Sequence, residues 1–287
     1  MRDLRFALVA LFAPLLLAGC GGSSSSTTPY PTILPATSYD LADFQPAGSP
    51  QPGKATTVSF VVRQPNGKPL TSFKEGLGPH TGVHVILVRD DLAYIIHMHP
   101  PVKHLGADGI IRLKAVFPAP GPWRAVIDIY PNTTGPVANF QLFHSVRVAG
   151  AYVPKKLPPF SPVVKLRGYT FTMHGKPNLK AIQASFITIT VTDPQGKPVV
   201  FTPWYGALAH AIFFREGSLG YFHTHICSAA TPNCTSLAGG PKIVGKSTAP
   251  GKLTVGVLVP QPGTWRLFLQ CKLGGIVTTA PFTLVVH

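Results

Sequence analysis

Histidines recur in this chain with a spacing that suits a metal ion. In each of two sets, the first histidine precedes the second by thirteen positions, and one residue separates the second from the third. The two sets are His84, His97 and His99, and His210, His223 and His225. Neutral imidazoles suit Cu(II), Zn(II) or Ni(II), and they suit Ca²⁺ and Mg²⁺ poorly. The pattern predicts a transition-metal site in each set, although hydrogen-bonded structural histidines are the alternative.

The first set falls on a predicted β-hairpin. Side chains alternate between faces along a strand, so His97 and His99 should point the same way. If the hairpin turns with two residues at Asp90 and Asp91, His84 lies directly opposite His97. We therefore expect the three imidazoles to share one face of one sheet.

The second hairpin predicts the same geometry, with a turn at Glu216-Gly217 and His210 opposite His223. The two hairpins differ in the spacing around their tyrosines, Tyr94 and Tyr221. When these are aligned, the first turn is one residue shorter, and an extra residue follows Tyr94. This difference predicts a β-bulge in the first hairpin, which could re-aim a side chain.

Other polar residues could complete or orient the two sites. His80 and His104 are candidates for a fourth ligand in the first set, and Cys227 continues the strand alternation in the second. Asp128 could accept a hydrogen bond from a ligating imidazole, and Gln270 holds the corresponding position in the second half. The alternative interpretation of Asp128 is an ordinary surface residue.

Three cysteines lie beyond the first twenty residues. Cys227 and Cys234 share an insertion over residues 226–246 and are predicted to form a disulfide, which would remove Cys227 as a thiolate ligand. Cys271 would then be free, or it could replace one of them as a partner.

Two further landmarks show that the chain is an internal repeat. Residues 64–69 match residues 193–198 as a glycine-containing turn after an alternating strand. Residues 120–124 match residues 262–266, and each segment opens a strand with a tryptophan that could anchor a core. The repeat predicts two domains over 39–150 and 165–287, joined by a proline-rich linker over 151–164.

The composition favours an all-β fold. Of 287 residues, only 12% are charged, while 31 are proline and 28 are glycine. Many short strands separated by turn residues are typical of β-sandwiches. We expect two tandem immunoglobulin-like β-sandwich domains, and a cupredoxin-like barrel is the alternative.

The first residues resemble a bacterial lipoprotein signal. A short basic start and an apolar run lead to Leu17-Ala18-Gly19-Cys20. The resemblance implies that residues 1–19 are a signal peptide and that Cys20 is lipidated. Residues 20–38 are rich in Ser, Thr and Pro and predict a flexible tether. The protein is then expected on the outer face of the cell membrane, held by its lipid anchor.

The net charge of +15 indicates attraction to polyanions. The basic residues are scattered and no nucleic-acid motif is present, so we expect no nucleic-acid partner. An anionic cell-wall polymer, or a protein that donates or accepts metal, fits better. The chain shows no nucleophile–base set, phosphate loop or catalytic carboxylate pair, and we expect no enzyme and no catalytic residues.

The hairpins resemble a family of secreted, mostly actinobacterial tandem-domain proteins related to the YtkA-like group. Its H-x-H-P signature falls on His84, Asp91, Leu92, His97, His99 and Pro100, and again on Gly206, His210, Arg215, Leu219, Tyr221, His223 and His225. The resemblance covers about residues 40–287 and implies an immunoglobulin-like fold with copper or heavy-metal association. The second copy departs from it with Ile226, where the family often has proline.

These observations predict a surface lipoprotein that binds copper, or less favourably zinc, for metal buffering or transfer. A non-catalytic adhesion module of the envelope, with structural histidines, is the alternative. A copper oxidoreductase on a sandwich is the least favoured of the three hypotheses.

Overall fold

The computed structural model describes residues 39–287, except 77, 80, 134–138 and 229–244. These described residues all belong to one compact unit. In the described ranges the regular secondary structure is entirely β, with sixteen strands. None of these residues forms a helix long and apolar enough to cross a membrane. The predicted signal peptide, tether and lipidation site, together with His80 and Cys234, lie outside the described residues.

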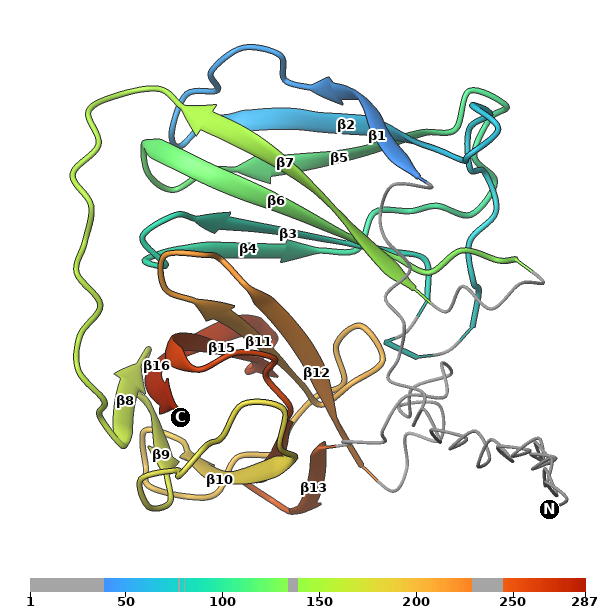
Figure 1. Cartoon of the computed structure of the whole chain (residues 1–287). Helices are drawn as coiled ribbons and strands as arrows, with labels where there is room; N and C mark the ends of the chain where they lie inside the picture. Colours follow the sequence, from blue (N-terminus) through green and yellow to red (C-terminus); the bar gives the residue numbers. More distant parts are fainter. Residues whose placement is uncertain (1–38, 77, 80, 134–138, 229–244) are drawn as a thin grey trace, which may run out of the picture. The chain divides into compact units, whose positions relative to one another are not determined.

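The first repeat is a sandwich of two antiparallel sheets (Figure 1). One sheet has the order β1-β2-β5, from strands Asp40–Gln45, Ala55–Arg63 and Ile110–Val116. The other has the order β4-β3-β6-β7, from strands Ile95–Met98, Val83–Arg89, Gly121–Ile129 and Phe140–Val148. A buried apolar core that includes Phe60, Val85 and Trp123 contacts both sheets. The prediction of an immunoglobulin-like sandwich is confirmed.

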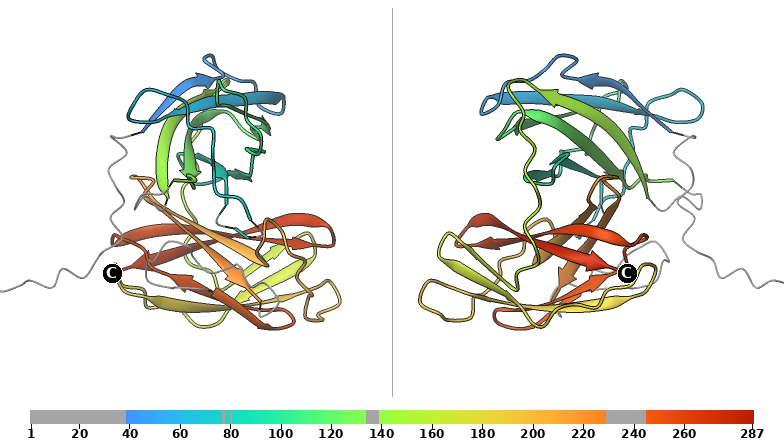
Figure 2. Two further views of the ribbon diagram at one scale, coloured as in Figure 1. Left: turned by 90° about the vertical axis from the view of Figure 1, so that its right-hand side faces the viewer. Right: turned by 60° about the vertical axis from the view of Figure 1, so that its left-hand side comes forward.

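The second repeat keeps the same strand order along one side and adds strands on the other. Figure 2 shows these strands, coloured from yellow to red, in two further views. Its order is β16-β15-β11-β12-β13-β14-β10-β9-β8 in one nine-stranded sheet. In chain order these strands are Val163–Leu166, Tyr169–Met173, Ser185–Thr192, Ala209–Arg215, Tyr221–Cys227, Gly245–Ala249, Lys252–Val257, Gly263–Leu273 and Ile276–Val286. The run β12-β11-β15-β16 corresponds to β4-β3-β6-β7. Strand β13 pairs in parallel with β12 and antiparallel with β14, and so joins the two sides.

The repeated landmarks have the structures that the sequence predicts. Gly67 and Gly196 both adopt positive φ, near +77° and +78°, in matching turns. Trp123 and Trp265 are buried in the two cores, and each indole N–H donates to a carbonyl four residues earlier. The same turn and the same anchor therefore build both repeats.

The inner strand of each histidine hairpin is buried on both faces. In β3, Val85 and Leu87 face the core of the first sandwich, whereas Ile86 and Val88 belong to a different apolar cluster. That cluster, here called the shared apolar cluster, combines residues of both repeats: Ile86, Val88, Leu92, Val126, Ile212, Phe214, Leu219 and Phe268. A strand covered on both sides is apolar at nearly every position, which explains why neither β3 nor β11 alternates in polarity.

The predicted hairpin register is wrong by two residues. Ile86 pairs with His97, and His210 pairs with His225. Both loops have four residues, because the Arg89 N–H bonds to the Tyr94 carbonyl and the Arg215 N–H to the Gly220 carbonyl. A shift of two residues keeps every side chain on its face, so the expected shared face survives the error.

The predicted bulge is also wrong, since the pairing of β3 with β4 is regular from Val85 with Met98 to Val88 with Ile95. The physical reason is the equal length of the two loops. In each loop a leucine with positive φ, Leu92 or Leu219, buries its side chain in the shared apolar cluster. Asp91 also lies in the first loop, where its carboxylate forms a bidentate ion pair with Arg89 at 2.7 and 2.8 Å.

Candidate metal centre

The six histidines of the two hairpins form a single cluster. The ring centroid of His97 lies 5.8 Å from that of His84 in its own repeat, 5.1 Å from His210 and 5.2 Å from His223 in the other. The expectation of a separate patch on each hairpin is therefore replaced by one site to which both repeats contribute. On each hairpin the histidines lie on the same strand face as the residues of the shared apolar cluster. Because that cluster joins the two repeats, their histidines come together as well.

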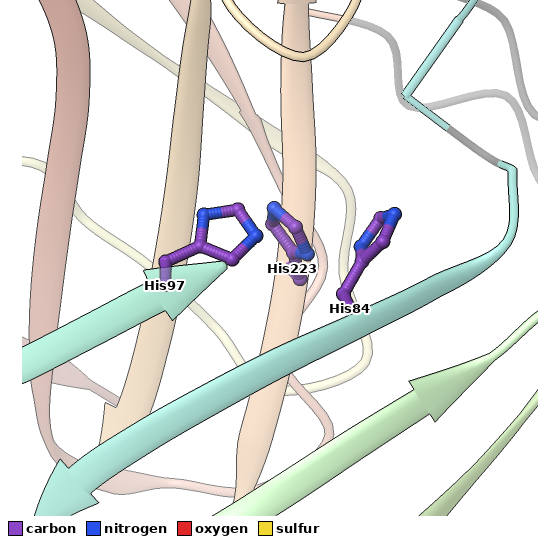
Figure 3. Close-up of side chains that lie close together, drawn as sticks. All are labelled: His84, His97 and His223. Carbon is purple, nitrogen blue, oxygen red and sulfur yellow. The ribbon is translucent and has the colours of Figure 1, made fainter. Parts of the chain in front are cut away.

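Two groups within this cluster have the spacing of metal ligands. One consists of His84, His97 and His223, and the other of His210, His223 and His225. In each group one nitrogen per ring lies within 4.8 Å of the others. Figure 3 shows the His223 ring between those of His97 and His84. The second group matches the predicted set, whereas in the first group His223 takes the place predicted for His99.

His99 lies beside the first group and stacks between two aromatic rings. Its ring is 3.9 Å from that of His84 and 3.8 Å from that of Tyr205, with interplanar angles of 12° and 6°. Its Nε2 is 3.2 Å from Nε2 of His97. Tyr205 and the neighbouring Trp204 were not predicted as site residues, although two adjacent aromatics shortly before His210 were a readable signal.

The hydrogen bonds of His97 fix which nitrogen is available to a metal. Its Nδ1 lies 3.1 Å from Oε1 of Gln270, whose amide nitrogen donates to Thr279 at 3.0 Å. Since the amide oxygen can only accept, the His97 Nδ1 carries the proton. The lone pair is therefore on Nε2. Gln270 orients a ring of the first hairpin, whereas the sequence predicted that it would orient one of the second.

His210 has the opposite arrangement of proton and lone pair to His97. Its Nε2 lies 3.0 Å from the carbonyl oxygen of Trp204, so this nitrogen donates and Nδ1 holds the lone pair. That Nδ1 is 3.4 Å from Nε2 of His223. Two nitrogens bound tetrahedrally to one ion at about 2.05 Å are about 3.3 Å apart. The pair thus already has the separation of two ligands on a common metal.

Asp128 is a buried carboxylate beside His84. Only 2% of the residue is exposed, so its interpretation as a surface aspartate is wrong. It accepts hydrogen bonds from Tyr130, Asn139 and Gln141, at 3.3, 3.2 and 2.8 Å. Its Oδ2 is 3.9 Å from Nδ1 of His84. Burial raises its pKa, and the three hydrogen bonds oppose that rise.

The surroundings of three of the imidazoles keep them neutral. Burial lowers the pKa of His97, His99 and His223, and repulsion among neighbouring imidazoles lowers it further. Neutral imidazole is the form that binds a metal ion. These three rings are therefore in the ligand state at neutral pH and do not have to release a proton.

Solvent can approach the cluster from the side of His99. His84, His97, His210 and His225 are buried, whereas His99 and His223 are partly exposed. His99 also lines a cavity of about 310 Å³, together with Pro100, Val102, Lys103 and residues of the 73–76 and 81–83 segments. His99, whose ring stacks on that of His84, is the point where this cavity meets the cluster.

The cysteines and His104 do not add ligands. Cys227 is disulfide-bonded, which excludes it as a thiolate ligand, and its predicted partner Cys234 lies outside the described residues. Cys271 is free and buried, so the alternative in which it forms the bridge is wrong. Burial raises the pKa of the Cys271 thiol to about 12. His104 is exposed and belongs to neither group.

The fold and the site define a protein of tandem immunoglobulin-like sandwiches with one histidine cluster built by both repeats. The chain belongs to the family described as "Domain of unknown function (DUF8832)", whose model matches it twice, over residues 37–148 and 164–287. A search of curated protein sequences finds no match.

Several solved structures match most of the chain at low similarity. The Escherichia coli adhesin FdeC has 15% identity and a TM-score of 0.25, with 87% of this chain and 64% of that chain covered. Invasin, a bacterial integrin-binding protein, has 17% identity and a TM-score of 0.22, with 86% and 39% covered. Domains 5–6 of the S-layer protein SbsC have 13% identity and a TM-score of 0.25, with 86% and 98% covered. At these scores the likenesses carry no argument about function.

Proposed function

We propose that this protein binds a transition metal, copper in preference to zinc, through the histidine cluster shared by its two repeats. The observation that carries the proposal is the convergence of five imidazoles into two ligand groups with a common member, His223. Hydrogen-bond acceptors already orient two of these rings, His97 through Gln270 and His210 through Trp204. Such fixed orientation is typical of ligating histidines.

The chemistry of the donors supports copper. The two groups offer imidazole nitrogens alone, which suit Cu(II), Zn(II) and Ni(II). Among divalent first-row ions, Cu(II) binds such donors most strongly. The remaining coordination positions are left to water or to a ligand that enters beside His99.

The role we propose is metal buffering or transfer at the outer face of a membrane. The N-terminal resemblance to a lipoprotein signal supports the location, with Cys20 as the lipidated residue. The cavity beside His99 supports exchange of the ion with solvent or with a partner protein. A site that stores or transfers metal needs such a route.

Calorimetric titration of the metal-free chain with Cu(II) and Zn(II) tests this function. The expected result is saturable binding, tighter for Cu(II) than for Zn(II), that a His97→Ala/His223→Ala double variant loses. His174→Ala is the matched control, because His174 contacts Thr190 outside the cluster. Equal binding by the wild type and the double variant would contradict the proposal.

A second candidate function is adhesion through an anionic cell-wall polymer. The observation in its favour is the excess of 25 Lys and Arg over 10 Asp and Glu. In this case polymer binding should weaken with added salt and be unaffected by a chelator. Sedimentation with isolated cell wall, in the presence and absence of chelator, separates the two functions.

A further inference from the structure

The five histidines of the two ligand groups cannot all serve one ion in the observed arrangement. Two nitrogens bound to the same ion at about 2.0–2.1 Å are at most about 4.2 Å apart. The described residues contain two groups with mutual spacing within 4.8 Å, and these groups overlap at His223. No such group contains all five histidines in that part of the chain. The arrangement therefore offers two positions for metal and one histidine common to both.

His223 is placed to contact both positions. Its ring centroid is 5.2 Å from that of His97 and 5.5 Å from that of His84 in the first group (Figure 3). It is 5.6 Å from that of His210 and 4.4 Å from that of His225 in the second group. No other histidine belongs to both groups among the described residues.

The two nitrogens of His223 have different surroundings. Nε2 lies 3.4 Å from Nδ1 of His210 and therefore faces the second group. Nδ1 is buried and, within the part of the chain that the structure describes, has no hydrogen-bond partner. A buried polar atom without a partner is costly, and metal coordination would satisfy it. The first group is where that second nitrogen would be used.

We propose that the cluster binds two metal ions, one in each group, and that His223 bridges them through its two ring nitrogens. This inference rests on the metal-binding function proposed above. Binding of the second ion displaces the remaining N–H proton of His223, which leaves to solvent, and no oxidant or reductant is required. The bridging imidazolate and the buried Asp128 carboxylate beside His84 offset part of the charge of the two ions.

The test is a copper count combined with a spin count on the full chain. The metal-free protein is loaded with Cu(II), excess metal is removed, and copper per chain is measured by mass spectrometry. Electron paramagnetic resonance then gives the number of unpaired spins. We expect two copper ions per chain and a spin count well below half of the copper, because an imidazolate bridge couples the two ions.

Single variants test the assignment of each position. His84→Ala and His225→Ala should each retain one copper with full spin intensity, while His223→Ala should abolish the coupled pair. His174→Ala should retain two coupled ions. The wild-type measurement needs no substitution, so a variant that fails to fold does not remove the test.

The outcomes separate this inference from the proposed function. One copper per chain with full spin intensity overturns the paired site and leaves metal binding standing. Two copper ions without coupling overturn the bridge, and with it the inference. No bound copper overturns both proposals.

Discussion

The two histidine hairpins are copies in sequence, but they contribute unequally to the site. His84, His97 and His99 occupy the same strand positions as His210, His223 and His225. All three members of the second set belong to a ligand group, whereas His99 is held between two rings beside the first. Equivalent positions of the two hairpins therefore have different surroundings within one composite cluster.

The residues that support the histidines differ in the same way. Asp128 pairs with His84 across β6 and β3, and Gln270 pairs with His210 across β15 and β11. Yet the side chain of Gln270 bonds to His97 of the other repeat. An acidic side chain thus lies beside one histidine of the first hairpin, and an amide from the second repeat bonds to another.

The sheets of the two repeats also differ. The first repeat has two separate sheets, while β13 joins the two sides of the second into one. The second hairpin strand, β12, is therefore paired on both edges, whereas β4 is at the edge of its sheet. The second hairpin has the firmer support, which agrees with its complete ligand group.

The largest expected effect is on the pH dependence of stability without metal. His97, His99 and His223 have a pKa that is lower in the folded protein than the usual value near 6.5. The unfolded chain therefore binds more protons below pH 6.5, and the stability present above that pH is lost as the pH falls. Three such groups give a slope of up to about 4 kcal/mol per pH unit. Denaturant unfolding at several pH values with chelator present measures it.

Removal of these three histidines should flatten that slope in proportion to the number removed. His97→Phe/His99→Phe removes two of the three groups, and His223→Phe removes one. The double variant should therefore flatten the profile more, by about 2.7 against about 1.4 kcal/mol per pH unit. Stability that does not change between pH 7.5 and pH 5 would contradict the prediction.

The shared apolar cluster allows a comparison of equivalent core positions in the two repeats. Phe214 is fully buried there and occupies the strand position equivalent to Val88. Phe214→Ala should lower the free energy of unfolding by about 3–5 kcal/mol, and Val88→Ala by less, because fewer buried atoms are removed. Calorimetry measures both. Phe186→Ala is the control, since Phe186 is 60% exposed and should change stability by less than about 0.5 kcal/mol.

Equivalent histidines should differ in their effect on metal affinity. His225 belongs to a ligand group and His99 does not. Loss of a residue that only orients a ligand typically costs about 10–100-fold, so His225→Ala should weaken copper binding at the second group by more than about 100-fold. His99→Ala should weaken it by less than about 10-fold. Competition with a chelator of known affinity measures both, and equal losses would show that the hairpins contribute equally.

The supporting residues should give the smallest effects. Gln270→Leu leaves the His97 N–H without its acceptor and should weaken copper binding by about 10–100-fold. Asp128→Asn keeps the shape of the side chain and removes its charge, and a loss of about 10-fold is expected. The same competition assay measures these changes. An unchanged affinity in both variants would mean that the histidines bind metal without this support.

The fold was predictable because its signals are local. The glycine turns at Gly67 and Gly196 and the core anchors Trp123 and Trp265 recur in order, and short-range geometry fixes each of them. Likewise, alternation along a strand placed each histidine set on one face, even though the register was wrong by two residues. A side chain changes face only when the strand pairing shifts by an odd number of residues. The pairing itself depends on the length of the loop.

The composite nature of the site could not be predicted from these local signals. Pairing between repeats depends on contacts far apart in the sequence, such as the 3.1 Å hydrogen bond from His97 to Gln270. One signal was present, because the unbroken apolar runs of β3 and β11 indicate strands covered on both faces. The identity of the covering surface, the other repeat, still had to come from the structure.

The contribution of both repeats to one cluster has a thermodynamic consequence. Metal that binds across the contact adds its free energy to the cohesion of the repeats, and by reciprocity their cohesion adds to metal affinity. A partner that binds the repeats only when they are apart must therefore weaken metal binding by the same factor. The contact between the hairpins would then act as a release mechanism, with mechanical separation of the repeats coupled to discharge of the ion.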